Sequence, residues 1–273
     1  MSDEIAAGPD QWLDWRRGDC EAFPARDDPA VRTRTGLAMR AASTPAESAE
    51  QVPFRKADFS HARHFARKSI RGLYAITPDQ PDTPALVQAV EQTLGAGTRL
   101  LQYRNKTADP RLRRKQLRAL QPICARYACT LVVNDDWQAA VDLGIGAVHI
   151  GGDDGDAAQV RGAVGPDVVL GVSCYASLER ARALLPYADY LAFGSVFASS
   201  TKPAAVSAAL GLLRQAREFG IPVVAIGGIN RRNARLVLDA GADAIAVISG
   251  IFGETSVAEA TTSLMEIIGK TRN

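Results

Sequence analysis

The sequence is poor in cysteine and has none of the spacings that mark disulfide frameworks or zinc sites. Only four cysteines occur in 273 residues, and no two of them form a Cys-x-x-Cys pair. Scattered thiols of this kind are typical of small buried side chains in a reducing compartment. We therefore expect free cysteines and a cytoplasmic protein.

Long hydrophobic runs are also missing. No stretch approaches the roughly 18 consecutive apolar residues that a membrane helix needs. Residues 1–10 contain acids and no basic cluster ahead of an apolar segment, so we expect no secretory signal peptide. The sequence thus predicts no membrane partner.

Neither sign of charge is in excess. The 32 Lys and Arg residues against 30 Asp and Glu residues leave a net charge of +2. A nucleic-acid or anionic-membrane binder would be expected to carry a clear basic excess. Small-molecule partners are therefore expected, while the oligomeric state stays open and a homo-oligomer is compatible with the sequence.

Residues 1–69 lack any strand-like run of β-branched residues and contain short runs of mixed charge. Such a composition buries too little apolar surface to order itself fully, so we expect a poorly ordered N-terminal extension. Two alternatives stay open: a short helix around Trp12 and Trp15 that docks on the main domain, or a native start further downstream. His61 and His64 have helical spacing, but no cysteine or carboxylate cluster completes a metal site around them.

From residue 70 onward, short apolar runs alternate with helix-period segments. Eight runs are expected to be strands: 73–77, 99–104, 131–134, 147–150, 168–173, 190–193, 223–226 and 244–248. The helical segments include 83–94, 109–127, 137–143, 178–185, 206–219 and 231–240. Strands without polar alternation are typical of parallel strands buried on both faces. The pattern predicts an α/β fold, a (β/α)8 TIM barrel over residues 70–273. An open doubly wound sheet is the alternative, but the glycine-rich turn expected after its first strand is absent.

In a barrel the chemistry gathers where the strands end, so the residues after each run are candidates. Gln102, Arg104 and Lys106 share one side of the second strand by alternation, and two cations with an amide suit a phosphorylated ligand. The alternative is a solvated basic rim.

Carboxylates follow the third and fourth strands, at Asp135, Asp136, Asp153 and Asp154. Together with the facing cations they suit a Mg²⁺ site for a diphosphate, whereas helix capping would explain some of the acids. His149, inside the fourth strand, is expected to be a hydrogen-bonded core residue.

The remaining strand ends carry hydroxyls and glycines. Ser173 has no visible partners that would make it a nucleophile. The Ser199-Ser200-Thr201-Lys202 run predicts a phosphate cradle and lid, with a plain surface loop as the alternative. Glycines after the seventh strand and small residues after the eighth predict a second phosphate site, with simple turn formation as the alternative.

Seven ordered blocks resemble the thiamine-phosphate synthase family over roughly residues 70–270. They are Gln-Tyr-Arg-x-Lys at 102–106, Asn-Asp-Asp at 134–136, Val-His-Ile-Gly-x-Asp-Asp at 148–154, Gly-Val-Ser at 171–173, Ser-Ser-Thr-Lys at 199–202, Ile-Gly-Gly-Ile at 226–229 and Ile-Ser at 248–249.

The resemblance implies an enzyme that joins an aminopyrimidine diphosphate to a thiazole phosphate, or its carboxylated form, with release of diphosphate. It implies that the C–O bond to diphosphate breaks first and that the thiazole nitrogen captures the resulting cation. It places the aminopyrimidine diphosphate on Gln102, Arg104, Lys106, Asn134, Ser173 and Lys202, with Arg104, Lys106, Ser173 and Lys202 as the catalytic set. It assigns Mg²⁺ to Asp135 and Asp154, and the thiazole phosphate to Ser199, Ser200, Thr201, Gly228, Ile248 and Ser249.

Two positions depart from the family pattern: Asn105, where an acid is more usual, and Gly152, where Gln is common. A related thiazole tautomerase and a non-catalytic barrel that binds thiamine phosphates are the competing hypotheses. Both kinds of protein would be expected to lack the residues that bind the diphosphate and the metal ion.

Overall fold

The computed structural model describes residues 60–152, 155–197 and 203–271. Five predicted ligands lie outside these ranges: Asp154, Ser199, Ser200, Thr201 and Lys202. Residues 1–59 of the expected N-terminal extension also lie outside them.

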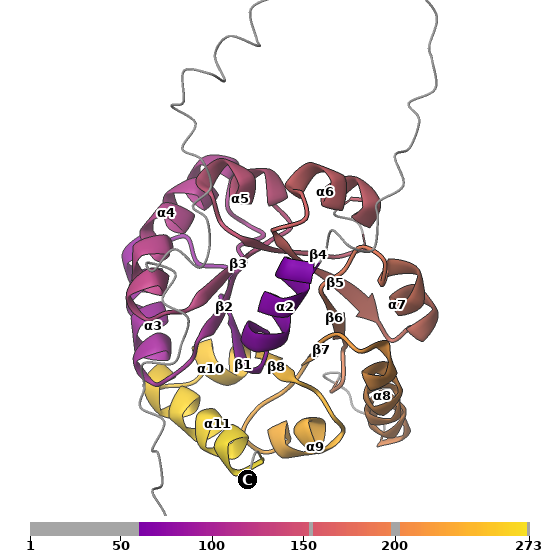
Figure 1. Ribbon diagram of the computed structural model, residues 1–273. Coiled ribbons are helices and arrows are strands. Elements are labelled where there is room, and N and C mark those ends of the chain that lie inside the picture. The colour runs from indigo at the N-terminus through magenta and orange to yellow at the C-terminus, as the bar shows by residue number, and fades with distance from the viewer. Residues whose placement is uncertain (1–59, 153–154, 198–202, 272–273) are drawn as a thin grey trace, which may run out of the picture. The chain divides into compact units, whose positions relative to one another are not determined.

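Eight parallel strands form a closed barrel in which each strand pairs with its neighbours in sequence and β8 closes onto β1 (Figure 1). This confirms the predicted (β/α)8 barrel. The strands are β1 Gly72–Ile76, β2 Leu100–Tyr103, β3 Thr130–Asn134, β4 Ala147–Ile150, β5 Val169–Tyr175, β6 Tyr190–Phe193, β7 Val223–Ile226 and β8 Ala244–Val247.

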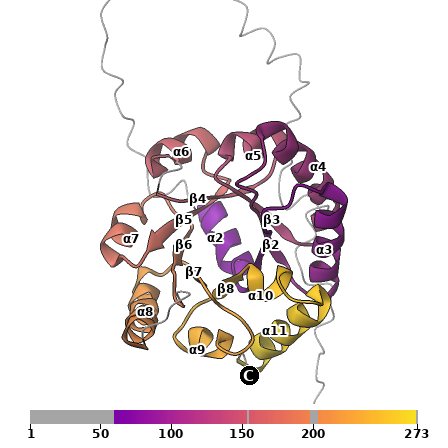
Figure 2. The ribbon, with the colours of Figure 1, turned by 180° about the vertical axis from the view of Figure 1, so that it is seen from behind.

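A ring of helices covers the outer face of the barrel (Figures 1 and 2). These helices are α3 Thr83–Gly95, α4 Pro110–Arg126, α5 Trp137–Leu143, α6 Ala157–Val164, α7 Leu178–Leu184, α8 Pro203–Ala216 with the 3-10 turn η4 Arg217–Phe219, α9 Ala234–Asp239, α10 Ser249–Phe252 and α11 Val257–Thr271. Aspartates begin several of them: the side chains of Asp82, Asp109, Asp136 and Asp156 accept a backbone N–H in the first turn of α3, α4, α5 and α6.

Helix α2, Ser60–Ser69, lies across one end of the barrel (Figure 1). Its Ala62 and Ala66 are buried in one cluster with inward-facing side chains near the strand starts, such as Leu100 and Val169. The Arg67 guanidinium donates to the carbonyl oxygen of Gly220, ahead of β7 (2.7 Å). The helix therefore covers the end where the strands begin and leaves the opposite end to the βα loops. The sequence pattern places residues 60–69 in a poorly ordered extension, whereas the structure shows them as this helix. The sequence pattern could not indicate this helix because its apolar face is short and packs against barrel residues that are distant in the sequence.

The core has two layers. One apolar cluster fills the space between the sheet and the surrounding helices, and the other fills the barrel interior, where it includes Tyr74 and Tyr190. Among the described residues, no helix is long and apolar enough to cross a membrane.

Candidate active site

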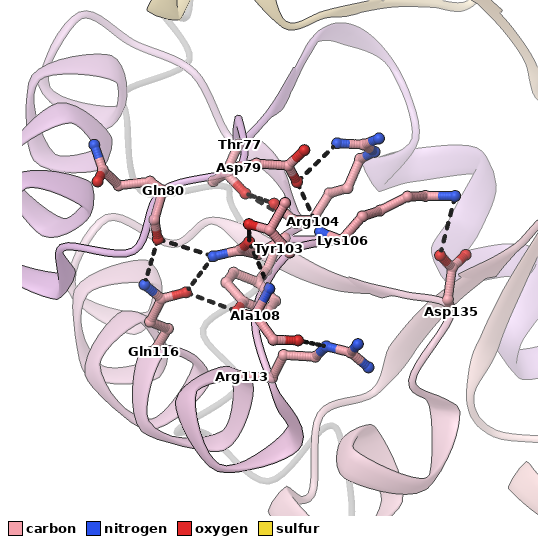
Figure 3. Close-up of polar contacts among 12 residues, drawn as sticks. Thr77, Asp79, Gln80, Tyr103, Arg104, Lys106, Ala108, Arg113, Gln116 and Asp135 are labelled. Atoms are coloured by element: carbon pink, nitrogen blue, oxygen red, sulfur yellow. Dashed lines mark hydrogen bonds and ion pairs between the residues drawn. The ribbon is translucent and has the colours of Figure 1, made fainter.

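Two loops at the carboxyl ends of β1 and β2 meet around the carboxylate of Asp79 (Figure 3). Asp79 Oδ1 accepts the Arg104 guanidinium (3.1 Å) and the backbone N–H of Lys106 (2.7 Å). Thr77 ties the same loops together, because its hydroxyl donates to the Arg104 carbonyl oxygen and accepts the Arg104 N–H, both at 2.8 Å. β2 ends at Tyr103, so Arg104 and Lys106 lie on the loop rather than on the strand, and Asp79 is what holds them together.

Asn105, between the two cations, turns away from them into the helical layer. It is buried, and its side-chain amide donates to the Gln80 carbonyl oxygen (2.8 Å) and to Gln116 Oε1 (3.1 Å). Its Oδ1 accepts the N–H of Ala108 (3.2 Å). A carboxylate here could not donate to those two oxygens. The departure at Asn105 therefore shapes the loop and leaves the faces of Arg104 and Lys106 unchanged.

The acids after β3 divide into two roles. Asp136 caps α5 by accepting the Ala139 N–H (3.0 Å) and lies 3.6 Å from the Arg113 guanidinium. Asp135 has a left-handed backbone (φ 65°), and its carboxylate lies 3.7 Å from the Lys106 ammonium. Helix capping thus accounts for Asp136, while Asp135 faces Lys106 on the loop after β2.

The donor chemistry at Asp135 fits a Mg²⁺ ion. Magnesium is commonly held by one or two carboxylates, with water and substrate phosphate oxygens completing its coordination. The Lys106–Asp135 pair is exposed enough, at 56% and 26% of the two side chains, to be exchanged for substrate at little cost. Within residues 60–152, 155–197 and 203–271, no group of three or more His, Cys, Asp or Glu residues could hold a metal on its own.

Ser173 lies beside an irregularity in β5, where the register against β6 shifts between Ser173 and Tyr175. Bulges of this kind re-aim side chains and are frequent near active sites. Ser173 Oγ lies 3.0 Å from His149 Nε2, and the Ser173 carbonyl oxygen accepts the Arg180 side chain (2.9 Å). Burial raises the pKa of the neighbouring Cys174 thiol to about 12, so this cysteine stays protonated and is no nucleophile.

His149 is the hydrogen-bonded core residue that the sequence predicts. It is 7% exposed, and its Nδ1 lies 3.0 Å from the Tyr190 hydroxyl while its Nε2 meets Ser173. Asn134, at the end of β3, is directly opposite His149 in the β3–β4 register.

Gly152 accommodates a tyrosine from the next strand. Its N–H donates to the Tyr175 hydroxyl (2.8 Å), and a Cβ at position 152 would lie only 2.7 Å from that oxygen. The Tyr175 ring in turn lies under the Arg180 guanidinium (5.5 Å to the ring centroid). A glutamine at this position would displace the Tyr175 ring. Glycine at position 152 therefore leaves the space that the Tyr175 side chain occupies.

The loops after β7 and β8 contact each other at the same end of the barrel. Gly228 has a positive φ of 64°, and a Cβ there would lie 2.2 Å from the Phe197 carbonyl oxygen. A Cβ at Gly250 would lie 2.7 Å from the carbonyl oxygen of Ile229, so the two loops are in contact. Ile248 occupies the N-cap position of α10, and Ser249 begins that helix with an exposed side chain.

The structure places all the described candidate residues at or just beneath one end of the barrel. Arg104, Lys106 and Asp135 form one cluster, while Ser173 joins a buried chain that also contains Gln102. Gly228, Ile248 and Ser249 lie on the β7 and β8 loops.

Sequence reasoning missed Thr77 and Asp79, which organise the cations. Their signal was their place directly after the first strand, at the end of the barrel where the other candidates gather.

Comparison with known proteins identifies relatives across the barrel. The family model described as thiamine monophosphate synthase matches residues 73–251. The thiamine-phosphate synthase of Methylobacillus flagellatus is 49% identical over 184 residues, covering 67% of this chain and 88% of the relative. That of Bordetella avium is 51% identical over 189 residues, covering 66% and 87%. Among solved structures, a thiamine phosphate pyrophosphorylase from Pyrococcus furiosus matches with a TM-score of 0.66 and 34% identity, covering 77% of this chain and 100% of that one.

Proposed function

Because the chain belongs to the thiamine monophosphate synthase family, we propose that its barrel mouth joins an aminopyrimidine diphosphate to a thiazole phosphate or its carboxylated form. The products are thiamine phosphate and diphosphate, with CO2 as a third product where the thiazole is carboxylated, and the chain is an alkyl transferase. The observation that carries this assignment is the pair of cations, Arg104 and Lys106, gathered by one carboxylate next to Asp135.

The first step breaks the bond between the pyrimidinylmethyl carbon and the diphosphate oxygen. The electron pair leaves with the oxygen, so negative charge grows on the diphosphate. The Arg104 guanidinium can donate bidentate hydrogen bonds to two of its oxygens, and the Lys106 ammonium supplies a positive charge beside them. Both side chains are held in weak, exposed ion pairs, so the diphosphate can replace Asp79 and Asp135 as their partner.

Asp135 and Asp154 would hold a Mg²⁺ ion, which, when bound, neutralises charge on the departing diphosphate. Ser173 and Lys202 would add donors to the same group, and Gln102 and Asn134 would hold the pyrimidine diphosphate. These roles come from the family resemblance. They are supported for Asp135 by its place beside Lys106.

In the second step the lone pair of the thiazole nitrogen forms the new C–N bond with the pyrimidinylmethyl cation. Gly228, Ile248 and Ser249 would hold the thiazole phosphate, together with Ser199, Ser200 and Thr201. The support is that the β7 and β8 loops end beside each other, as two halves of one phosphate cradle would. No protein nucleophile or base is required, so catalysis is positioning and electrostatic stabilisation.

The test is to incubate the purified full chain with both phosphorylated substrates and Mg²⁺, following thiamine phosphate and diphosphate together. The proposal predicts the two products in equal amounts. Isomerisation of the thiazole phosphate without condensation would support the tautomerase instead, and binding without turnover would support a non-catalytic barrel. The same preparation measured in EDTA tests the metal separately.

A cytoplasmic location is part of this proposal, supported by the free thiols of Cys124, Cys129 and Cys174. A homo-oligomer is compatible with the proposed reaction.

A further inference from the structure

Five side chains from different strands form one hydrogen-bonded chain through the barrel interior. Gln102 Nε2 donates to the Tyr74 hydroxyl (2.9 Å), and the Tyr74 and Tyr190 hydroxyls lie 2.9 Å apart. Tyr190 reaches His149 Nδ1 (3.0 Å), and His149 Nε2 reaches Ser173 Oγ (3.0 Å). The chain thus begins at one predicted substrate residue and ends at another, and its middle three members have no role in the proposed reaction.

The sequence makes room for this chain. A Cβ at Gly171 would lie 1.9 Å from Cζ and 2.4 Å from the hydroxyl of Tyr190, so only glycine leaves space for that phenol. The His149 and Tyr190 rings stack at 24° with centroids 5.5 Å apart, which fixes the orientation of the imidazole. Tyr74 and Tyr190 are almost wholly buried. The space left by Gly171 and the stacking of the His149 and Tyr190 rings therefore hold this polar chain in one arrangement.

The protons of the chain have one consistent direction. The Gln102 amide donates to Tyr74, and among the described contacts of Tyr74 the acceptor for its own proton is the Tyr190 oxygen. The reverse arrangement would leave a buried hydroxyl proton without an acceptor, which is costly. Tyr190 then donates to His149 Nδ1, so a neutral imidazole carries its proton on Nε2 and donates to Ser173.

We infer that Tyr74, Tyr190 and His149 are positioning residues that hold the Ser173 hydroxyl as a hydrogen-bond donor toward the pyrimidine diphosphate. Because Ser173 Oγ already accepts from His149, its own proton points to another acceptor at the barrel mouth. The inference rests on the proposed function, which supplies that acceptor as a diphosphate oxygen. A donor aimed at this oxygen becomes stronger as negative charge develops during bond breaking, so the chain acts mainly on kcat.

Burial supports a neutral chain. It raises the pKa of both Tyr74 and Tyr190 well above the ordinary tyrosine value, so both hydroxyls keep their protons at neutral pH. Hydrogen bonds in such a buried chain polarise and strengthen one another. The hydrogen bond that Ser173 donates is therefore strengthened by every member of the hydrogen-bonded chain before it.

The first test reads the His149 tautomer directly by ¹⁵N NMR of the full chain with labelled histidine at pH 7. The protein has only three histidines, so the His149 signals are assigned by their loss in His149→Gln. We expect a protonated Nε2 and an unprotonated Nδ1. The opposite tautomer would reverse the proton direction and overturn the inference. This readout needs no turnover, so it is independent of whether the proposed reaction occurs.

The second test compares two substitutions that each keep half of the imidazole. His149→Gln can place an amide donor near the position of Nε2 and keep the contact to Ser173, whereas His149→Asn places its amide near Nδ1 and loses that contact. We expect His149→Asn to lower kcat by about tenfold, the effect of one neutral hydrogen bond, with the KM for the thiazole phosphate unchanged. We expect His149→Gln to retain kcat within about threefold.

Equal losses in the two variants at equal thermal stability would overturn the inference. Tyr190→Phe provides a second measurement, since it keeps the ring and removes only the hydroxyl. It should lower kcat by about three- to tenfold, and His149 should then populate both neutral tautomers. An unchanged kcat with an unchanged tautomer would also overturn the inference. A wild-type chain that forms no thiamine phosphate would instead refute the proposed function.

Discussion

Replacing Gly171 by alanine is the most severe small change that the structure identifies. The added methyl carbon would lie 1.9 Å from Cζ and 2.3 Å from Cε1 of Tyr190, where ordinary contacts are 3.4 Å or more. Tyr190 is fully buried, so its ring has to move by well over an ångström into a packed interior.

Two terms set the magnitude. Overpacking of this kind costs about 1–3 kcal/mol. The Tyr190 hydroxyl also loses its contacts with Tyr74 and His149, and each such bond contributes about 1 kcal/mol. Gly171→Ala should therefore destabilise the fold by about 3–5 kcal/mol. At about 2–4 °C per kcal/mol, the melting temperature should fall by roughly 6–20 °C.

The assay is thermal and urea unfolding of the full chain, with Gly162→Ala as the matched control. Gly162 is an exposed residue of α6, and no neighbouring atom lies within 4 Å of the place that an alanine methyl would take, so alanine there should stabilise slightly, by about 0.5–1 kcal/mol. Combining Gly171→Ala with Tyr190→Leu should recover part of the loss, because the smaller side chain removes the clash. If Gly171→Ala unfolds at the same temperature as Gly162→Ala, the reasoning about the Tyr190 ring is refuted.

Three further predictions concern the site and the barrel base. Asp135→Ala should abolish synthesis with the fold intact, and turnover in this variant would contradict the metal assignment. The control, Asp136→Ala, should lower the free energy of unfolding by about 1 kcal/mol through the lost α5 cap and keep most of the activity. Lys202→Ala, at a position outside the described residues, should weaken diphosphate capture, and unchanged kcat and KM would count against that role. A chain starting at Ser69 should be about 3 kcal/mol less stable than one starting at Ser60, since α2 buries two alanines and part of a phenylalanine at about 0.8 kcal/mol per CH2; equal melting temperatures would show that α2 is dispensable.

The strands were the most predictable part of the fold. The bounds of β4, β6 and β7 match the sequence prediction because these strands are short, mostly apolar and almost entirely buried. Helix α2 escaped prediction because its apolar face consists mainly of Ala62, Phe65 and Ala66, which look unremarkable until the open base of a barrel lies against them. Local pattern cannot report a stabilising partner that is distant in sequence.

The candidate site was predictable in part for a similar reason. Residues at strand ends, such as Arg104, Asp135 and Ser173, could be selected because barrel topology gathers those ends. Asp79 could not be assigned its role, because the loop geometry that brings Arg104 and Lys106 to it is not encoded in spacing. The buried chain through Tyr190 depends on side chains that meet only across the interior.

The most direct test of the whole account is metal-dependent product formation by the wild-type chain. Both phosphorylated substrates are supplied with Mg²⁺ or with EDTA, and thiamine phosphate and diphosphate are measured over time. The account predicts equal amounts of the two products with Mg²⁺ and a large loss of both with EDTA. A folded chain that forms neither product with Mg²⁺ would contradict it.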